Sequence, residues 1–152
     1  MIACLLMSVQ STHAILFNYR KEKLLTCTSL KVPFIERISI HPLHQNSVVL
    51  MGKNYIRLWE LHPQESLLKE QQQLVPLKVE KENRFYDLSW QNMTQSKSPI
   101  LFVLTSRNKV LVIQGDSLVS SIELSGKEEL FSIKALRKGF CVGGGNKILS
   151  IY

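Results

Sequence analysis

The sequence has few cysteines and no pattern that would use them. Cys4, Cys27 and Cys141 are odd in number and far apart, and each lies in an apolar segment. They form neither the CxxC pair of a zinc site nor the disulfide framework of a small secreted protein. We therefore expect three reduced, buried thiols in an intracellular protein.

Long hydrophobic runs are absent as well. No segment approaches the roughly 20 apolar residues that a membrane-spanning helix needs. The opening segment, residues 1–10, is apolar, but it lacks the basic region and the cleavage site of a signal peptide. We therefore expect a soluble chain that does not have a membrane as its partner.

Patterns typical of catalysis are missing too. His41 and His44 are only two candidate ligands, and a metal site needs more, so we interpret residues 41–44 as a turn. The run Gly143–Asn146 has neither the Lys-Ser/Thr pair nor the helix of a phosphate-binding loop. Cys141 shows no activating base nearby in the sequence. We predict that the protein is not an enzyme and has no catalytic residue, cofactor or metal.

Charges of both signs are spread along the chain. The formal net charge is +7, and residues 1–76 carry 8 basic and 5 acidic side chains against 11 and 7 in residues 77–152. The densest basic clusters, Arg20–Lys23 and Leu136–Gly139, lie beside apolar runs. We interpret them as solvated turn residues, with an anion-binding patch as the alternative.

The chain does contain many short apolar runs. They are four to eight residues long, rich in Val, Ile, Leu and aromatics, and bounded by Gly, Pro, Asn, Ser or charged residues. Such runs are typical of strands. Gly52–Asn54, Arg107–Lys109 and Gly144–Asn146 supply residues suited to tight hairpin turns. We predict an all-β chain of about a dozen strands.

Two segments interrupt this pattern. The stretch "HPQESLLKEQQQLVP", residues 62–76, is predicted to be a short helical or mobile insertion, helical over residues 63–72. The stretch "QNMTQSKSP", residues 91–99, is predicted to be a loop. Neither is expected to separate two domains.

The apolar runs also repeat. Taking Phe17, Trp59, Ile113 and Ile151 as equivalent gives steps of 42, 54 and 38 residues. A period near 40 residues with four strands per unit is typical of a β-propeller blade. We predict a single incomplete propeller of about three to four blades over residues 1–152, beginning inside strand b of one blade and ending at strand c of another. The expected blade parts are residues 1–28, 35–80, 85–124 and 130–152.

One repeat unit carries a family resemblance. The stretch "ISIHPLHQNSVVLMGKNYIRLWEL", residues 38–61, ends in Trp59 followed by the acidic Glu60. It resembles the repeat of WD-repeat β-propeller proteins, which runs from strand a through strand c to a Trp and an acidic residue. Phe17, Ile113 and Ile151 stand in place of this Trp in the other units, and no unit has the Gly-His pair of the family.

A second resemblance is to one branch of that family. The stretches "KVLVIQGDSLVSSIEL" and "KGFCVGGGNKILSIY" are similar to the cilia- and flagella-associated WD-repeat proteins. This resemblance implies a non-enzymatic scaffold of the axoneme, in the cytoplasm and cytoskeleton, with dynein-tether or tubulin-associated proteins as partners. The coiled coils of those relatives do not occur in this chain.

Three residues are candidates for special roles. We expect Asp87 to stitch strands together by a hydrogen bond to a turn. Trp59 and Trp90 are predicted to pack between blades, with a role as interface anchors as the alternative. Incomplete blades would leave open edges and apolar faces such as those carrying Trp59 and Ile113, so we also expect self-association. A propeller subunit of an RNA-containing complex is the alternative function, supported by the net charge alone.

Overall fold

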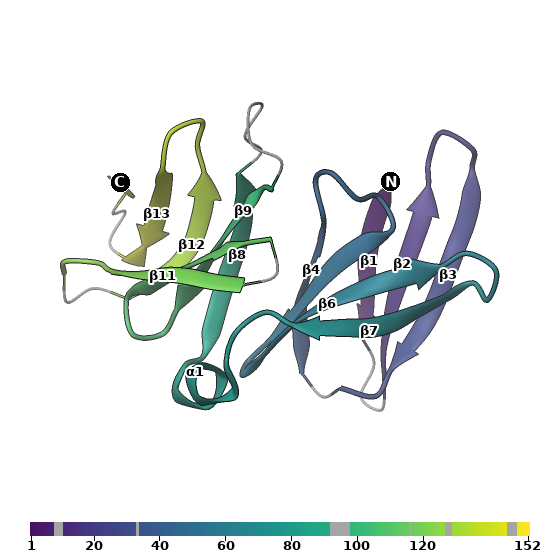
Figure 1. The fold of residues 1–152 in the computed structure, drawn as a ribbon, viewed down its shortest axis with the longest axis horizontal. Helices are drawn as coiled ribbons and strands as arrows, with labels where there is room; N and C mark the ends of the chain where they lie inside the picture. The colour runs from purple at the N-terminus through teal and green to yellow at the C-terminus, as the bar shows by residue number, and fades with distance from the viewer. Residues whose placement is uncertain (8–10, 33, 92–97, 116, 127–128, 146–148) are drawn as a thin grey trace. The chain divides into compact units, whose positions relative to one another are not determined.

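The computed structural model describes residues 1–7, 11–32, 34–91, 98–115, 117–126, 129–145 and 149–152. These residues form two compact units, Met1–Gln73 and Leu74–Tyr152, each of which is described by itself. Four antiparallel sheets and one short helix make up the two units (Figure 1), so the all-β prediction is confirmed. The boundaries expected for a single propeller domain stay a prediction.

The unit Met1–Gln73 contains two sheets, drawn from purple to teal in Figure 1. The first has the strand order β1-β2-β3, with bounds β1 (Ile2–Met7), β2 (Thr12–Asn18) and β3 (Lys23–Leu30). The second has the order β4-β5-β6-β7, with bounds β4 (Ile35–Ile40), β5 (Ser47–Gly52), β6 (Tyr55–His62) and β7 (Leu67–Gln73). Strands adjacent in sequence are adjacent in each sheet, which is the arrangement that short turns favour.

Alternation along the strands fills the core of this unit. Ala14 and Leu16 of β2 are fully buried, whereas Ile15 between them is only partly covered. Burying a large aliphatic side chain contributes about 1.5–3 kcal/mol. One core cluster joins both sheets and consists of Ala14, Leu16, Leu30, Ile35, Val48, Leu50, Trp59, Leu61 and Leu68.

The unit Leu74–Tyr152 contains helix α1 (Leu77–Glu82) and two further sheets. One has the order β11-β10-β9-β8, with bounds β8 (Phe85–Gln91), β9 (Ile100–Thr105), β10 (Lys109–Gln114) and β11 (Ser117–Glu123). The other has the order β12-β13-β14, with bounds β12 (Leu130–Ala135), β13 (Phe140–Gly144) and β14 (Leu149–Ile151). Their shared core consists of Phe102, Leu104, Val110, Leu124, Leu130, Ile133, Phe140 and Val142.

The predicted helix over residues 63–72 is wrong. The segment forms a β-hairpin in which β6 continues to His62 and β7 begins at Leu67, across a turn where Ser66 has a φ of 52°. Leu68 is buried in the core cluster, and its backbone N–H donates to Thr28 Oγ1 at 2.9 Å. Pairing and burial therefore override the helix propensity of a Leu-, Glu- and Gln-rich segment. The helix lies instead at Leu77–Glu82.

The repeat found in the sequence has a structural counterpart. In each of three sheets a β-bulge precedes the residues taken as equivalent, which are Phe17, Trp59 and Ile113. A bulge adds local twist at a fixed place in a strand and marks a recurring position. The predicted equivalence of these three residues is therefore confirmed.

The fourth member of that set is Tyr152 rather than Ile151. Trp59 pairs with Val48, which lies four residues before the end of β5, and the same position in β13 is Phe140. Phe140 exchanges backbone hydrogen bonds of 3.1 and 2.9 Å with Tyr152. The apolar pattern could not separate two adjacent candidates, because register in a hairpin is set by the turn.

The three cysteines are free, as predicted, but they are not all buried. Cys4 and Cys27 are exposed and Cys141 is partly exposed. Cys27 alternates along β3 with the buried Thr26 and Thr28, so a strand in an apolar segment still turns every second side chain outward.

Some expectations concern residues outside the described ranges. Most of the predicted loop 91–99 lies there, as does Asn146 of the predicted turn Gly144–Asn146. Gly115, which follows the last residue of β10, has a φ of 60°, a backbone conformation that favours glycine. Within the described part of the chain, no helix has the length and apolar character needed to cross a membrane.

Candidate functional site

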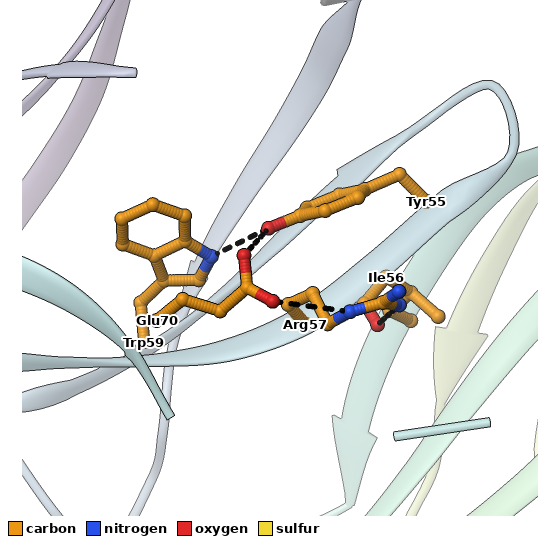
Figure 2. A network of polar contacts seen from close by, with 5 residues as sticks. All are labelled: Tyr55, Ile56, Arg57, Trp59 and Glu70. Carbon is orange, nitrogen blue, oxygen red and sulfur yellow. Dashed lines mark hydrogen bonds and ion pairs between the residues drawn. The ribbon is translucent and has the colours of Figure 1, made fainter. Parts of the chain in front are cut away.

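A polar network links β6 and β7 around Trp59 (Figure 2). The indole Nε1 donates to the Tyr55 hydroxyl at 2.9 Å, and that hydroxyl donates to Glu70 Oε2 at 2.8 Å. Arg57 Nε lies 3.4 Å from Glu70 Oε1, and its guanidinium lies over the Tyr55 ring at 4.9 Å. Trp59 is only 8% exposed and belongs to the core cluster, so it packs in the core as predicted.

The same network keeps Tyr55 protonated. Burial raises the pKa of the Tyr55 phenol far above its usual value, and the hydrogen bond to Glu70 raises it further. A neutral phenol can donate to Glu70 while it accepts from Trp59, which is the arrangement observed. The cluster therefore ties β6 and β7 together.

A polar ladder joins the two sheets of the unit Leu74–Tyr152. Asp87 Oδ2 accepts from the Ile133 backbone N–H at 3.0 Å, and Ser89 Oγ accepts from the Ala135 N–H at 2.9 Å. Gln91 Nε2 donates to the Leu136 carbonyl at 2.8 Å. The stitching role predicted for Asp87 is confirmed, and the partner in this bond is strand β12.

The predicted turn at residues 41–44 is well ordered by its first histidine. His41 Nδ1 accepts from the backbone N–H groups of Leu43 at 3.2 Å and His44 at 3.0 Å. The two imidazoles stack with ring centroids 4.7 Å apart. No group of three or more metal-ligating side chains occurs among the residues that the structure describes. Both histidines therefore shape the loop between β4 and β5.

The remaining candidates have packing positions. Gly144 ends β13, and a side chain there would overlap the Glu129 carbonyl oxygen, so this glycine permits close strand approach. Trp90 is partly buried on β8, and Cys141 is partly exposed on β13.

One face of the sheet β1-β2-β3 is apolar and exposed. Strand partners share a face, and the registers place Ile2 with Phe17 and Cys4 with Ile15. Ile2, Leu6 and Leu24 are 47%, 58% and 54% exposed. We call this surface the open face, and its residues are Ile2, Cys4, Leu6, His13, Ile15, Phe17, Leu24, Cys27 and Ser29.

The equivalent face is covered in both sheets where the structure describes a neighbour. Trp59, the counterpart of Phe17, lies in one cluster with Ala14 and Leu16 of the preceding sheet. In the other unit, the Phe140 ring lies 4.9 Å from that of Phe102 and stacks on Tyr152 at 5.4 Å. The open face therefore has the chemistry of a surface that another sheet covers.

The sheet β12-β13-β14 also has an exposed side, which is the side turned away from its core. Lys134, Cys141 and Ile151 are cross-strand partners, and Leu149 pairs with Gly143 on the same side. Ile151 and Leu149 are 70% and 69% exposed. We call this surface the free face; it points away from the core that contains Ile133 and Val142.

A hollow of about 440 Å³ lies where the β2–β3 turn approaches the loops at the end of the sheet β4-β5-β6-β7. Tyr19, Arg20 and Lys21 line it from the turn, and the amides of Gln45 and Asn46 line it from the β4–β5 loop. Leu25, Leu61 and Pro63 add apolar surface. We call it the loop hollow.

Sequence reasoning missed several of these features. Ser89 and Gln91 could have been found, because they follow Asp87 at intervals of two and so share its side of a strand. The loop hollow gave no such signal, since its two walls are some 25 residues apart in the sequence. The cluster Arg20–Lys23 was interpreted as solvated turn residues, with an anion-binding patch as the alternative, and the residues across the hollow from it were not identified.

No protein-family model and no curated protein matches the sequence. Among solved structures, the chain is similar to the β-propeller domain of Cps50 (Swd1) from Myceliophteria thermophila, with a TM-score of 0.65 at 10% identity over 93% of this chain and 47% of that one. It is also similar to the computationally designed Ika4 protein, with a TM-score of 0.58 at 12% identity over 97% of this chain and 88% of that one.

These likenesses show the fold alone, which is of the β-propeller type. The chain spans about half the length of the Cps50 domain.

Proposed function

We propose that this chain is a non-enzymatic protein-binding scaffold, and that its open face binds the free face of a second copy. The observation that carries the proposal is the exposed apolar surface around Ile2, Leu6 and Leu24. Exposed apolar patches of this kind mark interaction sites. The counterpart surfaces around Trp59 and Phe140 each pack against a neighbouring sheet.

A second copy fits this surface for two reasons. The free face, with Leu149 and Ile151, supplies the sheet face that the open face lacks. The chain also spans 47% of the Cps50 propeller domain, so two copies together approach its length. Contact between two different faces is head to tail, and it either closes into a ring or continues as a filament.

Sedimentation velocity tests this contact. We expect association that increases with concentration, and Leu24→Glu on the open face should raise the dissociation constant at least about 30-fold, as loss of an interface anchor does. Leu43→Glu is the matched control, because Leu43 is a 46% exposed leucine in a loop outside the open face. Ile151→Glu should weaken association equally.

Mixing the two face variants separates head-to-tail contact from other modes. Leu24→Glu keeps its free face and Ile151→Glu keeps its open face, so an equimolar mixture should form dimers that neither variant forms alone. A wild-type chain that is monomeric at all concentrations would contradict the proposal. So would association that Leu24→Glu abolishes and Ile151→Glu leaves unchanged, because the open face would then bind itself.

We propose further that the scaffold works in the cytoplasm and cytoskeleton, in the axoneme of a cilium or flagellum, with dynein-tether or tubulin-associated partners. The resemblance in residues 109–124 and 138–152 supports this placement. Expressed with a tag in ciliated cells, the chain should co-purify with detergent-extracted axonemes. Recovery entirely in the soluble fraction would count against it.

A subunit of an RNA-containing complex is the second candidate, supported by the net charge of +7. Binding to RNA would weaken steeply with salt, because phosphate contacts release counterions. An apolar contact between sheets would not weaken steeply with salt. Sedimentation of the chain alone and with an RNA oligonucleotide, each at several salt concentrations, therefore distinguishes the two functions.

A further inference from the structure

The loop hollow has walls that local hydrogen bonds hold in place. Asn18 Oδ1 accepts from the backbone N–H groups of Arg20 and Lys21, each at 3.2 Å. This is the side-chain-to-backbone pattern that fixes a turn. On the other wall, the Asn46 carbonyl accepts from the Leu61 N–H at 2.7 Å. The two basic residues are therefore presented on a defined turn.

The charge of the hollow is of one sign. Arg20 and Lys21 line it, and none of the described residues that line it carries a carboxylate. Among the described residues, neither basic side chain forms an ion pair. Glu65 of the β6–β7 turn is held by Lys69 at 2.6 Å, and the hydrogen bond from Lys69 lowers the pKa of its carboxyl group. The positive charge of the hollow is thus left for a ligand.

The Arg20 side chain is also oriented. Its Nε donates to the Tyr19 hydroxyl at 3.2 Å, and its guanidinium lies 5.8 Å from the centre of that ring. A guanidinium held in this way loses less side-chain entropy when it forms paired hydrogen bonds to a carboxylate. Its terminal nitrogens stay available for a ligand.

The size and the remaining lining suit a peptide. A volume of about 440 Å³ lies within the usual range of ligand sites. Gln45 and Asn46 supply amide groups that can bond the backbone of an extended segment, while Leu61 and Pro63 provide apolar surface. Two cations beside amides and apolar surface match a short segment with neighbouring carboxylates.

We propose that the loop hollow binds an acidic peptide segment of a partner protein, with Arg20 and Lys21 pairing with two Asp or Glu side chains. This proposal rests on the protein-binding function proposed above. It adds a second surface that is separate from the open face and takes a ligand of different chemistry.

Fluorescence anisotropy with a labelled hexaglutamate peptide tests the proposal. The wild-type chain should bind it saturably, and binding should weaken as salt is raised. The double variant Arg20→Glu/Lys21→Glu should bind at least about tenfold more weakly, because two attractive pairs become repulsive. Arg20→Gln/Lys21→Gln should lose binding to a smaller extent.

The matched control is Lys31→Glu/Lys53→Glu. It makes the same change of net charge at two exposed lysines that do not line the hollow, and it should alter binding less than about twofold. Circular dichroism melting confirms that each variant is folded.

Three results would overturn the proposal: no saturable binding by the wild-type chain, equal weakening by both charge-reversal pairs, or an RNA oligonucleotide that binds more tightly and depends on the same two residues. Sedimentation of the same samples tests the open face and the loop hollow independently. Failed peptide binding with intact self-association would overturn this proposal alone, and loss of self-association alone would overturn the second-copy contact.

Discussion

Replacing Trp59 by alanine should lower the free energy of unfolding by about 3–5 kcal/mol, the cost of removing a large buried aromatic side chain. Trp59 is 8% exposed and packs with Ala14, Leu16 and Leu68 in the core that joins both sheets of its unit. Its loss also removes the donor to the Tyr55 hydroxyl. Urea unfolding of the whole chain, followed by circular dichroism, measures the change.

Trp59→Phe is the control for this experiment. It keeps an aromatic ring in the core but loses the 2.9 Å hydrogen bond to Tyr55, so it should cost much less than alanine. A loss below about 1 kcal/mol for Trp59→Ala would fall in the range of surface substitutions. That outcome would mean that Trp59 does not stabilise the core, and it would favour the alternative that Trp59 is an interface anchor.

Replacing Asp87 by alanine should destabilise the unit Leu74–Tyr152 by about 1.5–3 kcal/mol, the range for hydrogen bonds to charged groups. The change removes the acceptor of the Ile133 N–H, so that amide should also exchange its hydrogen faster. Urea unfolding and native-state hydrogen exchange measure both effects.

Two variants show whether the ladder acts as described. Asp87→Asn keeps an acceptor oxygen and should retain most of the stability. Ser89→Ala removes a neutral acceptor of the Ala135 N–H and should cost about 0.5–1.5 kcal/mol. Unchanged exchange at Ile133 in Asp87→Ala would show that the Asp87 bond does not hold the two sheets together.

Strands with a strong local pattern could be predicted from the sequence, and elements decided by tertiary contacts could not. The composition of the apolar run ILFVLT predicts β9, and Asn108 before Lys109 predicts a turn, because asparagine tolerates a positive φ. β7 contains one buried leucine and three glutamines, and only its pairing with β6 makes it a strand. The shift from Ile151 to Tyr152 has the same cause, since register depends on a partner strand.

The candidate surfaces followed the same division. Asp87 was found because an acid stands out in an apolar run, and its partner on β12 lies 46 residues away and could not be identified. Exposed apolar blade faces were expected around Trp59 and Ile113, but these two residues are 8% and 0% exposed. The exposed face lies instead on the sheet β1-β2-β3, and its members depend on which side of β1 faces the core. The loop hollow required both walls to be placed in space.

The ladder at β8 has a consequence for tolerance to mutation. Asp87 and Ser89 bond the backbone N–H groups of Ile133 and Ala135, and Gln91 bonds a backbone carbonyl. Every non-proline residue offers the same backbone groups, so the side chains of β12 can change without loss of these bonds. Residues on the outward side of β12, such as Lys134, can therefore change without loss of the ladder and are constrained only by the contact proposed for the free face. Proline at position 133 or 135 is the exception, because it removes the bonded N–H.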